Sequence, residues 1–469
     1  MTTRAAPSRP WTETWDPEDE DFWERGARHI ARRNLSVAML AGHLAHSVWG
    51  MWSALVLFRS PGAGPAYGPG GAFLLVAAPV AAGAALRCAG DRTPGRADRP
   101  GGRDRVVLGT AALLLPALAA AWLVQRPGTP LWALLAVAAT AGAGGGALSA
   151  ATARHIASLY PRRDRTPAPA TGGGLSGVAA AQALGLLVVA AAGDARPAYV
   201  AVALLPAIAL VVLAAGLGMD DPVPLRTSRA LRVVPPVRRR AVARRRAPWV
   251  LPLRAGMSGA LLGHCLAFGP VLRSEFGASP RQAASYAFLG ALLGWAARSL
   301  GGRVTGRRAA GRVVLAGFLG AAVTAALLPA ARGTLGGFAG GFAVLCVCGG
   351  AGAGALDRLV RGGVRRAGAQ DGPSGVVDDG RGVDGGPGVD GGPGVADALG
   401  GVVVLLAFAA CYAVPGGSAA PALWGLAGVH GVCAVVTWAV TRRRGRMAAA
   451  APYRPGALSV VPARVSSRN

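Results

Sequence analysis

The chain contains no lysine and few acidic residues, so its charge comes mostly from arginine. Lysine and arginine together number 49, every one of them arginine, against 22 aspartates and glutamates. Charged residues amount to only 15% of the 469 residues, whereas hydrophobic residues amount to 52%. Soluble domains carry about 25% charged residues. This shortage of charge excludes an ordinary soluble domain and indicates a membrane protein.

The net charge of +27 would by itself suggest a nucleic-acid partner. The arginines, however, lie in short loops between apolar runs, and no basic surface interleaved with aromatic residues joins them. We therefore expect a lipid bilayer around this protein and no nucleic-acid partner.

Clusters of residues that could form a catalytic or metal-binding site are equally scarce. The six cysteines fall within or at the edges of apolar runs, and Cys346-x-Cys348 has no accompanying pair of histidines or cysteines. Small buried thiols are therefore expected in place of a metal site. No nucleophile with a base, metal-ligand spacing or phosphate-binding loop stands out, so we expect no enzyme, no cofactor and no metal. The N-terminus has no apolar core of a cleaved signal peptide.

What the chain does have is twelve apolar runs long enough to cross a hydrocarbon core about 30 Å thick. They are centred on 35–58, 71–89, 106–125, 130–153, 172–192, 197–218, 249–272, 284–302, 312–331, 335–356, 397–414 and 421–440. The sequence therefore predicts an all-α polytopic membrane protein with twelve transmembrane helices.

The charges of the loops support this count. The loops after spans two, four, six, eight and ten are rich in arginine, whereas the other loops hold one or two arginines or none. Positive charge marks the cytoplasmic side of short loops. We therefore expect a multi-pass protein of the plasma (inner) membrane with both termini in the cytoplasm.

A long loop with many arginines and prolines divides the chain into two halves of six spans. The predicted parts are a cytoplasmic arm at 1–33, six-helix bundles at 34–218 and 249–441, a linker at 219–248 and a cytoplasmic tail at 442–469.

Two polar stretches allow competing interpretations. Residues 15–35 have the periodicity of a short interfacial helix, but their composition favours a solvated cytoplasmic arm. Residues 367–395 contain GVDGGP twice in tandem. Two short copies with proline cannot build stacked calcium-binding coils, so a flexible cytoplasmic loop is expected there.

Several segments together resemble a known family. They are WDPEDEDFWERGARHIARRNL with HSVWGMWSALVLF, then AAPVAAGAALR, GGGALSAATARHIASLYP, TGGGLSGVAAAQ, AFGPVLRSEFG, YAFLGALLGWAARSLGG, GAGAGALDRLV and VTWAVTRRR. In this order they are similar to the nitrate/nitrite porter family, bacterial NarK type, of the major facilitator superfamily. The resemblance covers nearly all the membrane portion. It implies a fold of two six-helix bundles, in keeping with the two halves.

Arginines inside two of these spans are the main candidate site residues. An arginine in hydrocarbon costs a few kcal/mol or more, and it usually faces a water-filled path or a partner. The resemblance implies that Arg87 in span two and Arg298 in span eight clamp the anion. Guanidinium offers planar, permanently charged donors that suit a planar oxyanion. The alternative for either residue is an arginine of the cytoplasmic flank.

The resemblance further implies a glycine-rich signature in span five, where backbones approach closely. It falls here on Gly172, Gly173, Gly174 and Gly177. The chain departs from the family at the signature asparagines, which fall on Leu175 and Ala353, and at a tyrosine, which falls on Asp357. Loss of polar partners weakens the orientation and selectivity of an anion site.

Asp357 with Arg358 is expected to be a structural ion pair or flank, with a gate as the alternative. His264 in span seven is expected to be a buried structural residue, with a role in substrate contact or proton relay as the alternative.

These observations predict a transporter of a small inorganic anion, nitrate or nitrite by resemblance, that works by alternating access around Arg87 and Arg298. We expect a monomer. Because no carboxylate stands out deep in a span, exchange is favoured over proton symport. The alternatives are a diverged transporter of another substrate and a membrane sensor or scaffold that does not transport.

Overall fold

The structure is a computed structural model that describes residues 15–17, 19–58, 67–92, 102–160, 168–192, 198–220, 249–370 and 391–449. Most of the predicted linker at 219–248, much of the predicted loop at 367–395 and most of the tail at 442–469 lie outside these residues. At the edges of that loop, helices extend to Gln370 and resume at Gly391. The described residues contain helices and no β-strand.

A helix, continuous or interrupted, corresponds to every predicted span. In the first half these are α2 (Arg28–Leu55), α3 (Pro69–Arg92), α4 (Gly102–Ala111) with α5 (Leu114–Leu123), α6 (Leu131–Leu159), α7 (Ala168–Ala192), and α8 (Ala198–Val202) with α9 (Leu205–Gly218). In the second half they are α11 (Val250–Arg254) continued through a π turn into α12 (Ala260–Phe276), then α13 (Pro280–Gly301), α14 (Arg307–Leu327), α15 (Leu335–Gln370), α16 (Gly391–Tyr412) and α17 (Ala420–Ala449).

Within the described part of the chain, ten of these spans are long and apolar enough to cross a membrane. The other two, α2 and α13, have membrane length but carry more polar residues. Both pack among neighbouring helices of the two halves: α2 packs against α7, and α13 packs against α7 and α15. The predicted all-α fold is therefore confirmed. Its two more polar spans pack against other helices, so their polar side chains can contact protein.

Local sequence explains where the central helices begin and end. Ser279 caps α13 in a reciprocal capping box with Gln282, and Pro280 occupies the first turn, where its missing N–H costs nothing. The preceding α12 ends at Gly277, whose φ of 59° is the left-handed conformation that stops a helix at low cost in glycine. The turn between α12 and α13 is thus fixed by sequence.

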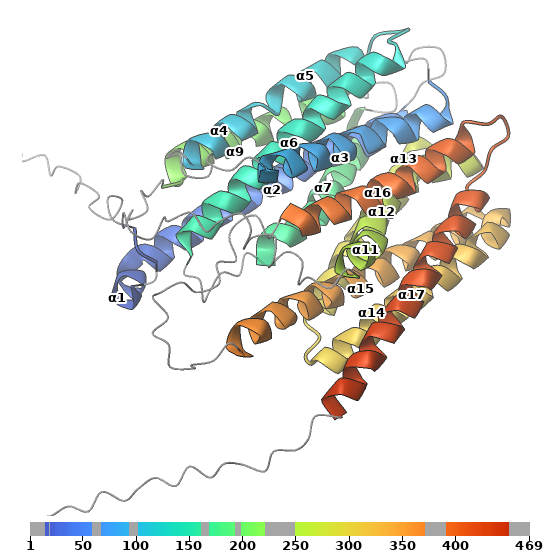
Figure 1. The fold of residues 1–469 in the computed structure, drawn as a ribbon. Helices are drawn as coiled ribbons and strands as arrows, with labels where there is room; N and C mark the ends of the chain where they lie inside the picture. The colour runs from blue at the N-terminus through green and yellow to red at the C-terminus, as the bar shows by residue number, and fades with distance from the viewer. Residues whose placement is uncertain are drawn as a thin grey trace, which may run out of the picture.

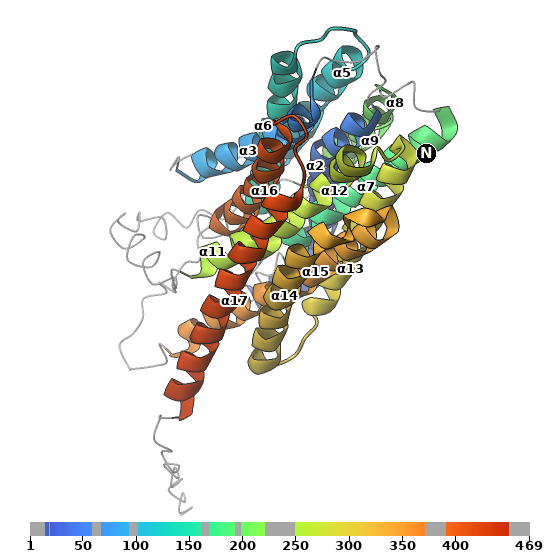
Figure 2. The same ribbon diagram turned by 90° about the vertical axis from the view of Figure 1, so that its right-hand side faces the viewer.

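The two halves meet along inner helices. α3 packs against α16, and α7 packs against α13. Figure 1 shows α3 and α16 side by side, with α4, α5 and α9 on one flank of the molecule and α14 and α17 on the other. The view in Figure 2 also places α14 and α17 at the periphery. Large apolar side chains on the outer helices are exposed, among them Leu115, Trp132 and Leu217. Such a surface fits contact with lipid.

The described part of the N-terminal segment, from Trp15 onward, packs two tryptophans against the bundle, unlike a fully solvated arm. Trp15 and Trp23 are buried in a small cluster with Ile156 and Leu159 at the end of α6. The indole Nε1 of Trp15 donates a hydrogen bond to the carbonyl of Leu159 at 3.3 Å. Burial of two tryptophans outweighs the charge of the segment, because each removes a large apolar area from water.

Candidate functional site

Arg298 lies near the end of α13 with its side chain only 13% exposed. Its Nη2 donates a hydrogen bond to Oδ2 of Asp357 on α15 at 2.8 Å. The two helices approach closely because a Cβ on Gly354 would collide with the carbonyl of Arg298. Glycine at this position therefore brings the Asp357 carboxylate within reach of the guanidinium.

A second arginine holds the same carboxylate. Arg254, at the end of α11, donates from Nη1 to Oδ1 of Asp357 and from Nη2 to Oδ2 of Asp397 on α16 at 2.9 Å. The Arg254 side chain is 5% exposed, that of Asp357 9% and that of Asp397 19%. We call Arg254, Arg298, Asp357 and Asp397 the charge cluster. It joins α11, α13, α15 and α16, and its formal charges sum to zero.

Two atoms of the charge cluster have no hydrogen-bond partner among the described residues. They are Oδ1 of Asp397 and Nε of Arg254, both buried. A buried carboxylate oxygen without a donor is costly, because its desolvation is not repaid. The cluster is therefore compact and neutral but not fully satisfied.

Arg87 on α3 has different surroundings. Its guanidinium carbon lies 5.5 Å from the centre of the Trp49 ring on α2. The His46 ring packs on the same tryptophan, with ring centres 4.9 Å apart. On the other side, Nη1 of Arg87 lies 2.9 Å from where a Cβ on Gly394 would stand. Arg87 thus reaches from the first half to the start of α16.

The start of α16 connects the two predicted site arginines. Gly394, beside Arg87, precedes Asp397 of the charge cluster by about one helical turn. Arg254 links Asp397 to Asp357, and Asp357 binds Arg298. The structure therefore arranges Arg87 and Arg298 around one chain of contacts at the end of the bundle predicted to be cytoplasmic.

The glycines predicted as a signature lie in α7, where the helix packs on α2. A Cβ on Gly177 would collide with the carbonyl of His43, and Oγ of Ser47 donates to the carbonyl of Gly177 at 3.0 Å. Gly174 lies against the ring of His46. Gly172 and Gly173 belong to the first turns of α7. The two described glycine contacts lie within the first half.

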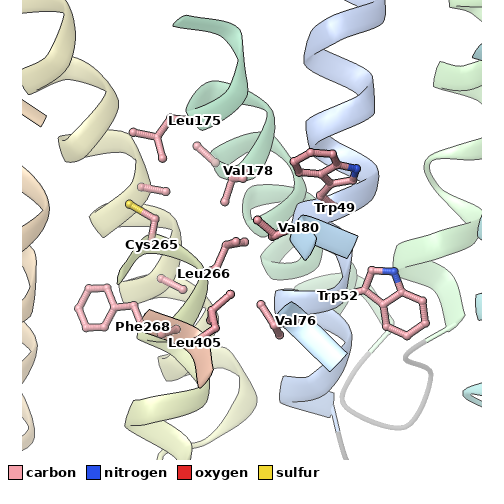
Figure 3. Close-up of a cluster of buried hydrophobic side chains, with 14 of the residues drawn as sticks. Trp49, Trp52, Val76, Val80, Leu175, Val178, Cys265, Leu266, Phe268 and Leu405 are labelled. Atoms are coloured by element: carbon pink, nitrogen blue, oxygen red, sulfur yellow. The ribbon is translucent and has the colours of Figure 1, made fainter. Parts of the chain in front are cut away.

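The positions of the missing asparagines are apolar and buried. Leu175 is 5% exposed and Ala353 is 0% exposed. A Cβ on Gly294 would lie 3.5 Å from Leu175, and Gly294 precedes Arg298 by about one turn of α13. Figure 3 shows Leu175 and Val178 in an apolar cluster that also contains Cys265 and Leu266. Both positions are therefore occupied by hydrocarbon, and Leu175 faces α13 about one turn before Arg298.

A buried glutamine supplies a polar contact between the halves. Nε2 of Gln182 on α7 donates to the carbonyl of Cys265 on α12 at 2.9 Å and reaches Oγ of Ser53 on α2 at 3.3 Å. Sequence reasoning missed Gln182, Arg254 and Asp397. The signal was the same as for Arg298: a polar residue within or at the start of an apolar run.

The structure bears on three further expectations from the sequence. Asp357 forms ion pairs as expected, but with Arg254 and Arg298, while Arg358 is exposed. His264 is buried among rings, 5.8 Å from that of Phe342 and 5.9 Å from that of His430. No group of three or more metal-ligating side chains occurs among the described residues.

At the opposite end of the bundle, aromatic rings join the two halves. The ring of Phe73 on α3 stacks on Phe408 and Tyr412 of α16, at 5.6 Å and 5.2 Å between ring centres. The hydroxyl of Tyr412 donates to Glu275 at 2.6 Å, and Arg332 pairs with the same carboxylate at 2.6 Å. The α3–α16 contact is thus aromatic at one end and charged at the other.

Comparison with known proteins places this arrangement in context. Residues 75–360 match the family model of the Major Facilitator Superfamily. The chain is 30% identical over 344 residues to the nitrate/nitrite transporter NarU of Escherichia coli, covering 68% of this chain and 70% of that protein. It is 36% identical over 139 residues to the probable nitrate/nitrite antiporter NarK2 of Thermus thermophilus, covering 30% of each.

Solved structures agree on the fold. The xylose transporter XylE of E. coli, in a partially occluded inward open conformation, superposes with a TM-score of 0.62 at 12% identity, covering 87% of this chain and 99% of that one. The nucleoside transporter NupG superposes with a TM-score of 0.55 at 13% identity over the same shares. At such low identity these likenesses concern the fold alone.

Proposed function

The chain belongs to the nitrate/nitrite porter family of the major facilitator superfamily, and on this premise we propose that it carries nitrate and nitrite across the membrane between its two halves. As a member of this superfamily it is a membrane transporter and not an enzyme. Arg87 and Arg298 are proposed as the residues that bind the anion. The proposal includes a monomer with both termini in the cytoplasm.

The observation that carries the proposal is the contact of the Asp357 carboxylate with Arg298. A buried guanidinium there already binds a planar oxyanion, the side chain of Asp357, through Nη2 at 2.8 Å. Nitrate and nitrite are also planar or bent oxyanions with delocalised charge. Guanidinium suits such groups because its donors are planar and its charge is permanent. The chemistry that holds Asp357 would therefore serve the substrate.

Arg87 supports the same interpretation from the first half. The Trp49 ring holds its guanidinium through a cation–π contact. Because Arg87 belongs to α3 and Arg298 to α13, an anion bound by both would bridge the two halves. Substrate binding would then bias how the halves sit against each other, as alternating access requires.

The aromatic contact at the other end suits this mechanism. Stacking of Phe73 on Phe408 and Tyr412 joins α3 to α16 there. A rocking motion would separate these rings when that end opens, and it would leave the helices of each half packed. The printed name of the T. thermophilus relative, an antiporter, favours exchange of one anion for the other.

Exchange in proteoliposomes tests the proposal. Vesicles loaded with nitrate and holding purified full-length protein are expected to take up external nitrite. Arg298→Ala and Arg87→Ala should each abolish uptake, because each removes one of the two guanidinium groups proposed to bind the anion. Arg303→Ala is the matched control, because Arg303 comes shortly after Arg298 in the sequence but its side chain is exposed. If the wild-type protein is folded but transports neither nitrate nor nitrite, the proposal is contradicted.

A second candidate is transport of another small anion. It is favoured by Leu175 and Ala353, which put hydrocarbon where the family has asparagines. The same vesicles distinguish the two candidates by competition. Formate, chloride and thiocyanate would each be added outside the vesicles as competitors. If one of them suppresses nitrite uptake more strongly than external nitrate does, that anion is the diverged substrate.

A further inference from the structure

The outer end of the bundle, which lies opposite the charge cluster, is closed by direct contact between the two halves. The Phe73 ring of α3 lies 5.2 Å from the ring of Tyr412 on α16, with an interplanar angle of 3°. A Cβ on Gly70 would lie 3.0 Å from the carbonyl oxygen of Ala409, so the backbones of α3 and α16 approach closely as well. Phe73 and Tyr412 are both buried. This end can therefore open only if the two rings separate.

A buried carboxylate holds Tyr412 from within the second half. Glu275, near the end of α12, has a side chain that is 2% exposed. Its Oε1 accepts a hydrogen bond from the Tyr412 hydroxyl at 2.6 Å and another from the backbone N–H of Ala419, just before α17. Its Oε2 lies 2.6 Å from Nη2 of Arg332, in the turn between α14 and α15. We call Phe73, Glu275, Arg332 and Tyr412 the outer latch.

The bonds to Glu275 fix the position of the Tyr412 ring. Hydrogen bonds to an ionised acceptor are short and strong, so they hold their donor in one geometry. The hydroxyl lies at the tip of the tyrosine ring, while Phe73 lies on the face of the same ring. Aromatic pairs attract each other best in particular relative orientations. Glu275 therefore acts on the contact between the halves through Tyr412.

The outer latch contains contacts within one half and a contact between the halves. Tyr412, Ala419 and Arg332 all belong to the second half, so a rocking motion of that half as one body keeps their contacts with Glu275. The stack of Phe73 on Tyr412 joins the halves, so it exists only while the outer end is closed. A contact made in only one of two states shifts the equilibrium toward that state. The carboxylate thus prepares the second half to close on the first.

Stabilisation of the fold is a weak reason for burying this carboxylate. Replacing a buried ion pair by apolar side chains of similar volume is often neutral or stabilising. Arg332 is moreover 44% exposed, so water weakens its attraction to Glu275. What the carboxylate supplies here is a fixed position for the ring that meets the other half.

We propose that Glu275 is a positioning residue of the transport cycle, which holds Tyr412 in the orientation that closes the outer end on Phe73. Loss of the hydrogen bond between Glu275 and Tyr412 shifts the protein toward the state that is open at the outer end and closed at the charge cluster. The inference rests on the alternating access of the proposed function, but it does not depend on which anion is carried. Arg332 has the task of holding the carboxylate in place.

Hydrogen–deuterium exchange of the full chain in lipid nanodiscs, read by mass spectrometry without substrate, measures this shift. Tyr412→Phe keeps the ring and removes only the hydroxyl, whereas Glu275→Gln removes the charge that Arg332 holds. Both variants are expected to exchange faster around Phe73 on α3, in the half to which Glu275 does not belong. Both should exchange more slowly around the charge cluster, because the two ends of an alternating-access transporter open in turn.

Two further variants complete the comparison. Phe73→Leu should give the same pair of changes from the first half, because it removes the stack and leaves the bonds of Glu275 intact. Arg281→Gln is the matched control, because Arg281 is an exposed charge at the same end of the bundle, on α13. It should exchange as the wild type does at both ends. If Glu275→Gln fails to fold, Tyr412→Phe still decides, because it breaks the same hydrogen bond.

The pattern of exchange separates a latch from a local anchor of the fold. Faster exchange confined to the end of α12 and the turn before α17, with α3 unchanged, would overturn the inference. Faster exchange at both ends of the bundle would mean general loosening and would overturn it as well. The vesicle assay decides the proposed function separately. A wild type that exchanges neither anion contradicts that function, whereas opposite changes at the two ends would still support the latch.

Discussion

The two halves present their site arginines in different surroundings. Arg87 of the first half lies against the face of Trp49, whereas Arg298 of the second half is bound to a carboxylate that a further arginine also holds. An aromatic ring orients a guanidinium through a cation–π contact. A carboxylate orients it and neutralises it. The two arginines that the sequence makes equivalent are therefore unequal in the folded protein.

This difference assigns different tasks to the halves. Under the proposed function, Arg87 would contact the anion from α3 of the first half, with Trp49 holding its guanidinium. Under the proposed function, Arg298 would bind the anion in competition with Asp357, with which it already forms an ion pair. Mutations that act on one half and spare the other are the means of testing this division.

The largest effect is expected from Arg254→Met, which breaks the charge cluster. Without Arg254, Asp357 keeps its ion pair with Arg298, whereas Asp397 loses the one partner described for it. Removing one partner of a buried ion pair costs about 3–5 kcal/mol. Thermal unfolding in detergent should therefore shift strongly downward.

The double variant Arg254→Met, Asp397→Leu should recover much of this stability, because the ion pair of Asp357 with Arg298 is kept and the buried carboxylate of Asp397 is gone. If Arg254→Met unfolds at the same temperature as wild type, the cluster contributes little, and the contrast between the halves is weaker than the geometry indicates. Arg303→Ala provides the baseline for loss of an exposed arginine.

The fold was predictable from the sequence because its main signal is local. Each span is a continuous apolar run, and the arginines in alternate loops fix the count. The two spans that fall short of the apolarity of the other ten, α2 and α13, were also predicted, from the runs 35–58 and 284–302. Hydrophobicity over about twenty residues decides whether a segment crosses a bilayer, and no knowledge of its neighbours is needed.

The site was predictable only in part, because its contacts are not local. Arg298 and Asp357 could be singled out as charges in spans, but their pairing joins residues 59 positions apart. Arg254 and Asp397 stand at the ends of apolar runs, where charge usually marks the flank. Their pairing over 143 positions depends on how α11 packs on α16. The same holds for Trp15, whose partner on α6 is 144 residues away.

A smaller effect is expected from Leu175→Asn, which puts a polar side chain against α13 about one turn before Arg298. Leu175 is buried and lies against Gly294, one turn before that arginine. An amide buried there without a partner costs about 1–3 kcal/mol. An anion at Arg298 would supply an acceptor for it.

Leu175→Asn should therefore lower the thermal stability of the empty protein and increase the stabilisation that nitrate gives, measured in the same unfolding assay. Val178→Thr, one turn along the same face of α7 in Figure 3, controls for added polarity. Equal stabilisation by nitrate in wild type and Leu175→Asn would mean that the anion does not approach α7.

The smallest effect is expected from Trp49→Phe, which weakens the contact that orients Arg87. Phenylalanine keeps a ring but has a weaker attraction for a cation than the indole of tryptophan. The cation–π contribution is about 0.5–1 kcal/mol at partly exposed sites, so nitrate affinity should fall about two- to fivefold. Trp52→Phe is the matched control, because Trp52 is equally buried on the same helix. Truncating it costs similar packing without touching the described contact of Arg87. If the two variants lose the same affinity, packing in α2 is responsible, and the aromatic surroundings of Arg87 do not set it apart from Arg298.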